Sequence, residues 1–103
     1  MNQEVTYSEA TRSLAGRLRH PSIQQTLKAG VTLHPAKSNC IYIEMSENSD
    51  AQITAHHFDD EQIIYTVELY VDNHEGDTKE VFSWTTLDWH EVRAKVLELK
   101  ASI

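Results

Sequence analysis

The sequence predicts an α+β domain in which one antiparallel sheet is covered on one face by a C-terminal helix. Apolar residues recur at helical spacing near both ends of the chain. In the middle they alternate with polar residues, and short polar segments separate the alternating runs. We therefore expect two N-terminal helices, a four-stranded antiparallel meander and a final helix, in the order α-α-β-β-β-β-α, within a single domain over residues 1–103.

The helical segment, residues 1–30, begins with the signature of a helix start. Thr6 and Glu9 have the spacing of a capping box, in which each side chain accepts a hydrogen bond from the backbone N–H group of the other residue. Pro21 should end this helix near His20, because the residue before a proline is disfavoured in the α region. The apolar stripe of the helix consists of Tyr7, Ala10, Leu14 and Leu18.

A second, shorter helix is expected over about residues 22–29. Ile23 and Leu27 lie four positions apart, and Gly30 is a suitable C-terminal stop. The next segment, residues 31–39, contains a proline and gives a mixed pattern. We interpret it as a connector between the helices and the sheet.

Four strands are expected in the sheet segment, residues 40–85. The clearest strand, residues 63–71, has an apolar residue at every second position. The polar connections between strands are short, which favours antiparallel pairing of each strand with the next. The expected strands cover residues 40–45, 51–58, 63–71 and 79–85.

The final helix, residues 88–101, has the best-defined start in the sequence. Asp88 and Glu91 form a second capping box, and Leu87 is placed to contact Val92 as a hydrophobic staple. We expect this helix to pack on one face of the sheet through an apolar stripe. The stripe consists of Trp89, Val92, Val96 and Leu99.

Charge is distributed unevenly along the chain, which has a formal net charge of −7. Residues 41–103 carry fourteen Asp or Glu against four Lys or Arg, whereas residues 1–40 carry two against five. The acidic balance favours a basic partner and disfavours direct binding to nucleic acid or to an anionic membrane. The basic residues of the helical segment are expected to lie against the acidic sheet or to bridge towards it. They are Arg12, Arg17, Arg19 and Lys28.

Composition also indicates the compartment. The longest apolar run is too short to span a membrane, and the start of the chain lacks the apolar core of a secretion signal. The single cysteine excludes an internal disulfide and fits a reducing environment. We therefore expect a cytoplasmic protein.

The meander topology predicts where the acidic loops meet. In such a sheet the first and third hairpin loops emerge at one end, so seven carboxylates should gather there, opposed only by Lys79. The second hairpin loop, residues 59–61, should lie at the opposite end. The expected partner-binding residues are Glu44, Glu47, Asp50, Asp72, Glu75, Asp77 and Glu80.

Two interpretations of this acidic pole stay open. In the first, the carboxylates only keep the protein in solution. In the second, they dock on a basic surface and imitate the phosphates of a nucleic acid, where complementary charge speeds association. The expected function is then non-catalytic inhibition of a nucleic-acid-binding enzyme or complex. The analogy, from size and charge alone, is with inhibitors from phages or mobile elements and with toxin immunity proteins.

Aromatic residues of the strands suggest a second interface. If Phe82 and Trp84 point away from the final helix, they join Tyr42, Ile64 and Tyr70 in an apolar surface suited to a homodimer. If they point inward, they belong to the core under that helix. Periodicity alone does not decide between the two, because the register of a short edge strand is poorly specified.

No residue pattern indicates catalysis, a cofactor or a metal site. His56 and His57 are adjacent on a strand and should point to opposite faces, and the other histidines lack ligand spacing. Cys40 is expected to be a small buried residue rather than a nucleophile. The alternative is a small-molecule-binding or enzymatic domain with an aromatic cavity, in which Cys40, His56 or His90 supplies polar groups. We expect no enzymatic activity, no cofactor and no metal.

Overall fold

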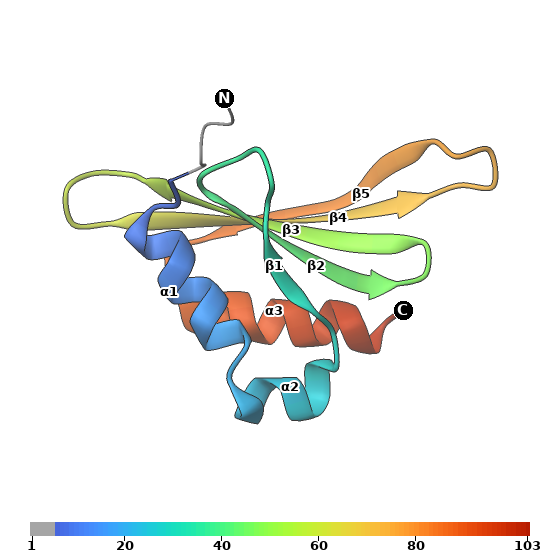
Figure 1. The fold of residues 1–103 in the computed structure, drawn as a ribbon, viewed down its shortest axis with the longest axis horizontal. Coiled ribbons are helices and arrows are strands. Elements are labelled where there is room, and N and C mark those ends of the chain that lie inside the picture. The colour runs from blue at the N-terminus through green and yellow to red at the C-terminus, as the bar shows by residue number, and fades with distance from the viewer. Residues whose placement is uncertain (1–5) are drawn as a thin grey trace.

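The computed structural model describes residues 6–103, so the first five residues of the expected helical segment lie outside the described part of the chain. In residues 6–103, three helices cover one face of a five-stranded antiparallel sheet (Figure 1). This confirms the α+β class. No helix in this part of the chain is long and apolar enough to cross a membrane. The elements are α1 (Glu9–Leu18), α2 (Pro21–Leu27), β1 (Val31–Leu33), β2 (Cys40–Ser46), β3 (Ser49–His57), β4 (Ile63–Asp72), β5 (Thr78–Thr86) and α3 (Trp89–Ala101).

The sheet has one strand more than the sequence predicted. Strand β1 occupies the start of the expected connector and pairs antiparallel with β2, so that Val31 opposes Ile43. Its three residues are too few to show a clear alternation. The prediction of four strands was therefore wrong by one short edge strand.

The strands follow one another in the order β1-β2-β3-β4-β5, as a meander should. Ile53 of β3 lies between Ile41 of β2 and Val67 of β4, and all three side chains are fully buried under the helices. The β2–β3 and β4–β5 hairpins emerge at one end of the sheet, and the β3–β4 hairpin emerges at the other (Figure 1). The predicted topology is thus confirmed for the four long strands.

The start of α1 differs from the prediction. The N-cap is Ser8, whose Oγ accepts a hydrogen bond from the backbone N–H of Thr11 at 3.1 Å. Thr6 lies outside the helix and is exposed, so the Thr6–Glu9 capping box was wrong. The predicted break near Pro21 is confirmed, because α1 ends at Leu18 and Pro21 opens α2.

The end of α2 also lies earlier than expected. Lys28, with φ of 50°, takes the left-handed conformation that stops the helix. The expected stop at Gly30 is therefore wrong, although glycine is the residue that usually occupies such a position. The helix ends two residues earlier than expected, and residues 28–30 connect it to β1.

Helix α3 begins as predicted at Asp88, whose Oδ1 accepts from the backbone N–H of His90 at 2.9 Å. In the predicted capping box, Glu91 would accept from the backbone N–H of Asp88. Its carboxylate accepts instead from the hydroxyl of Thr86 at 2.9 Å. Val92 is fully buried, whereas Leu87 is 56% exposed. Leu87 therefore stays in contact with solvent.

Candidate functional site

Positive charge lies mainly in the helical layer. Of the nine Lys and Arg residues, seven lie on a helix or at its C-terminal cap: Arg12, Arg17, Arg19, Lys28, Arg93, Lys95 and Lys100. The guanidinium of Arg17 lies over the Trp89 ring, with Cζ 4.4 Å from the ring centroid. Arg19 donates a hydrogen bond from Nε to the carbonyl oxygen of Val31 at 2.9 Å. Among residues 6–103 the only ion pair joins Lys95 to Glu98. Ion pairs from these cations to the acidic sheet are therefore not formed in this part of the chain, whereas the expected position against the sheet holds for Arg19, which bonds to strand β1.

Negative charge lies on the sheet and its hairpins. Apart from Lys37 and Lys79, the Asp, Glu, Lys and Arg residues of this region are all acidic: Glu44, Glu47, Asp50, Asp59, Asp60, Glu61, Glu68, Asp72, Glu75, Asp77 and Glu80. The two layers of the molecule are thus opposite in charge. The helices leave one face of the sheet free, and we call it the open face (Figure 1).

Strand register collects carboxylates on one half of the open face. Glu44 opposes Asp50 across β2 and β3, Asp50 opposes Tyr70 across β3 and β4, and Tyr70 opposes Glu80 across β4 and β5. Directly opposed side chains have Cβ atoms about 5 Å apart. We call the resulting surface the acidic face; it comprises Glu44, Asp50, Glu68, Asp72 and Glu80 together with Tyr42 and Tyr70.

A bulge in β5 places Glu80 on this face. Leu69 opposes Phe82 but the next residue, Tyr70, opposes Glu80, so that Val81 is the extra residue. Without this bulge, strict alternation would put Glu80 on the same side as Phe82. The bulge therefore turns a carboxylate away from the helices and towards the other acids.

Glu68 lies at the centre of the acidic face, although sequence reasoning missed it. The Tyr70 hydroxyl donates to Glu68 Oε2 at 3.0 Å, and burial together with this bond raises the pKa of Tyr70 to about 12. A hydrogen bond with the Glu68 carboxyl also raises the pKa of Glu80. The alternation of β4 could have indicated this position, because Glu68 lies between Val67 and Leu69, which are buried on the other face.

The acidic face is linked to the β2–β3 turn, which carries Glu47. The backbone N–H of Asp72 donates to the carbonyl oxygen of Asn48 at 2.8 Å. Burial and then the neighbouring Asp50 raise the pKa of Tyr42 on the same face. The structure therefore brings five of the seven predicted residues to one region: Glu44, Glu47, Asp50, Asp72 and Glu80.

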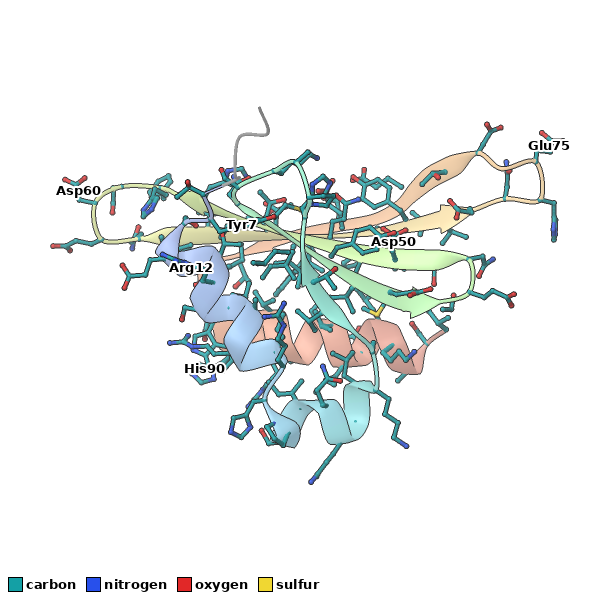
Figure 2. All side chains as sticks on the ribbon, in the orientation of Figure 1. Tyr7, Arg12, Asp50, Asp60, Glu75 and His90 are labelled. Carbon is teal, nitrogen blue, oxygen red and sulfur yellow. The ribbon has the colours of Figure 1, made fainter. Side chains whose placement is uncertain are left out.

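Glu75 and Asp77 do not join this group. They lie in the β4–β5 turn, which Asn73 closes by accepting from the backbone N–H groups of both residues at 2.8 and 2.9 Å. Figure 2 shows Glu75 at the tip of the hairpin, beyond the part of the sheet that carries Asp50, while Asp60 lies at the opposite end of the molecule. The predicted single pole is therefore an acidic face with a separate acidic tip.

The second predicted interface is divided between the two faces of the sheet. Phe82 and Trp84 oppose Leu69 and Val67, and both aromatic rings pack against the core under α3. Lys95 covers these rings, with Nζ at 5.6 Å and 5.1 Å from their centroids. The inward alternative is confirmed, and the remaining three residues, Tyr42, Ile64 and Tyr70, lie on the open face.

The polar groups considered for an aromatic cavity are also separated. Cys40 and His56 lie on the open face, opposite Thr54 and Ile64, whereas His90 lies on α3 with its ring 4.2 Å from that of Trp89. The Cys40 thiol is fully buried, and this burial raises its pKa. Within residues 6–103, no three His, Cys, Asp or Glu side chains form a cluster that could hold a metal ion.

Comparison with known proteins gives no assignment. No family model matches the chain, and no curated protein or solved structure shows significant similarity to it. Functional inference therefore depends on the charge and geometry of the two layers.

Proposed function

We propose that this chain is a non-catalytic, acidic protein-binding module whose acidic face docks on a basic surface of a partner protein. The partner is a nucleic-acid-binding enzyme or complex, and the module inhibits it by occupying the surface that would otherwise bind phosphates. Cytoplasmic inhibitors from phages or mobile elements, and immunity proteins, are the functional classes that this proposal fits. The observation that carries it is the separation of charge between the open face and the helical layer.

The arrangement of the acidic face supports a cationic partner. Alternate residues of one strand are about 7 Å apart, and opposed residues of neighbouring strands are about 5 Å apart. Carboxylates at these spacings repel one another, so they contribute nothing favourable to folding when they are ionised. Within β2–β5, the strand registers place no Lys or Arg opposite any of the five carboxylates. A surface of Lys and Arg side chains would relieve this repulsion on binding.

The same arrangement disfavours self-association through the open face. Two copies meeting there would oppose acidic face to acidic face, and like charge suppresses such contacts. The buried Cys40 thiol, with its raised pKa, has little of the thiolate form that a nucleophile needs. Both points favour a binding module over the enzyme and over a homodimer formed through the open face.

The proposal can be tested with three double variants that each remove two negative charges. The first, Asp50→Asn with Glu80→Gln, alters the acidic face. The second, Glu75→Gln with Asp77→Asn, alters the hairpin tip. The third, Asp60→Asn with Glu61→Gln, is the matched control at the opposite end of the sheet (Figure 2).

Proteins retained from a native lysate at low and at high salt identify candidate partners, whose affinity for each variant is then measured. The acidic-face variant should weaken binding roughly tenfold, since each charge in such a contact contributes about 0.7 kcal/mol. The tip variant should have a smaller effect and the control almost none. Added salt should weaken wild-type binding steeply, because exposed charges are screened beyond a Debye length of about 8 Å at physiological salt. Affinity that is insensitive to salt and to the acidic-face variant would overturn the proposal.

Inhibition is a separate measurement. A nucleic acid bound to the captured partner should be displaced by the wild-type chain and less readily by the acidic-face variant. If a ternary complex forms instead, the chain binds its partner elsewhere and does not imitate phosphates.

A further inference from the structure

A second feature of the open face lies at the other end of β4 and β5. A shallow groove there is lined by three apolar residues, two threonines and two acidic residues: Phe58, Ile64, Leu87, Thr85, Thr86, Asp88 and Glu91. The groove lies where the chain leaves the sheet for α3. None of its lining residues is Lys or Arg.

The apolar side chains of this groove are unusually exposed. Phe58 is 63% exposed and Leu87 is 56% exposed, and these are two of the four large hydrophobic residues with such exposure in residues 6–103. Leu87 is available because it does not close the expected staple with Val92, which is buried in the core. Apolar surface that is adjacent and exposed favours a contact with another molecule.

The groove is continuous with the acidic face along β4. Ile64, Thr66, Glu68, Tyr70 and Asp72 occupy every second position of this strand and lie on the open face. From Ile64 to Asp72 this strip extends for about 27 Å at the usual rise of a strand. One end of the strip is therefore apolar, and the other is acidic.

We propose that the groove anchors an apolar side chain of the same basic segment that the acidic face binds. The inference rests on the proposed function and specifies its partner: a segment rich in Lys or Arg, with a large apolar residue at one end. Charge complementarity supports this occupant, because one end of the strip carries Glu68 and Asp72 and the groove itself is lined by Asp88 and Glu91. The apolar side chain in the groove would contribute affinity that salt does not weaken. The charged contacts would raise the association rate and fix the orientation of the segment.

Synthetic peptides of about ten residues, long enough to follow the strip, provide the probe. One peptide alternates Lys and Ser. Two others replace a terminal pair of residues by Leu-Leu, one at each end, so that no chain direction is assumed. Each is titrated against the full chain at low salt, and the oligomeric state of the protein is measured by sedimentation under the same conditions.

One of the Leu-containing peptides should bind roughly fivefold more tightly than the Lys–Ser peptide, which corresponds to partial burial of two leucines. The variant Leu87→Ser should abolish this preference and leave affinity for the Lys–Ser peptide unchanged. Ile103→Ser is the matched control, since Ile103 is 53% exposed and does not line the groove. Phe58→Ser provides an independent second variant, and unfolding curves verify that each variant is folded.

The outcomes separate this inference from the proposed function. Equal binding of all three peptides, weakened by the acidic-face variant, would overturn the anchor and support the proposed function. No binding of any peptide at low salt would overturn both. A wild-type dimer that Leu87→Ser converts to a monomer would show that a second copy occupies the groove, and would likewise overturn the anchor.

Discussion

The two faces of the sheet are made by the same strands, yet they differ in what stabilises them. On β4, Val67 is fully buried under the helices, whereas its neighbours Thr66 and Glu68 are only partly buried on the open face. The helix-covered face gains free energy from apolar burial. The acidic face places like charges side by side. Folding therefore explains the residues of the first face but not the charge pattern of the second, which is why we assign binding to the second.

The largest effect should come from the helix-covered face. Ile53→Ala removes a fully buried side chain from the central strand β3 and leaves a cavity between β2 and β4. We expect a loss of about 2–5 kcal/mol in the free energy of unfolding. Chemical denaturation measures this loss directly.

Thr66→Ala is the matched variant on the open face. Thr66 opposes Thr54 on the open face, beside the buried Val67. Its replacement should change the free energy of unfolding by less than about 0.5 kcal/mol. If the two variants are equally destabilising, the open face contributes to folding as much as the covered face, and the contrast drawn here is wrong.

An intermediate effect is expected where α3 begins, because this helix covers β4 and β5. Asp88→Ala removes the acceptor of the 2.9 Å hydrogen bond from the His90 backbone N–H. Loss of an N-cap typically costs about 1 kcal/mol of stability. Thermal unfolding of the variant should show this loss.

Asp60→Ala serves as its control, since it removes the same charge from the exposed β3–β4 hairpin loop and not from a helix N-cap (Figure 2). It should leave stability nearly unchanged. An equal loss in both variants would indicate an effect of net charge and not of the cap.

Most of the fold could be predicted because its signals are long and local. The four long strands run for seven to ten residues and alternate over most of that length, and Asp88 marks the start of α3. Short polar turns then leave the meander as the simplest topology. Strand β1 was missed because three residues carry almost no periodic signal, and its pairing depends on Ile41 and Ile43 much further along the chain.

The candidate site was predicted less completely, for two physical reasons. Acidic residues were assigned by their position in loops, so Glu68, which lies within a strand, was missed, and Glu75 was included although the hairpin carries it away from the sheet. The bulge at Val81 also changes which residues of β5 share a face. Bulges depend on pairing with a neighbouring strand, and local sequence does not reveal them reliably.

The smallest effect should be a change in pH dependence on the acidic face. Hydrogen bonding with Glu68 raises the pKa of Glu80 above its ordinary value of 4.5. A carboxyl whose pKa is raised by folding stabilises the native state at pH values below the ordinary pKa, and this contribution is lost as the pH rises through the raised pKa. Above its raised pKa, Glu80 adds a negative charge beside the other acidic residues of this face.

Glu80→Gln should therefore be slightly more stable than the wild type at neutral pH, because the amide can donate to Glu68 without carrying charge. The advantage should shrink as the pH falls through the raised pKa of Glu80, where Glu80 of the wild type itself becomes protonated. Denaturation across this pH range measures the difference, with Glu75→Gln as the variant that removes a charge from the hairpin tip. The stability gain of Glu80→Gln could instead stay constant with pH, or Glu75→Gln could show the same gain. Either result would mean that general repulsion among the acidic residues, and not the Glu68–Glu80 pair, lowers the stability of the wild type.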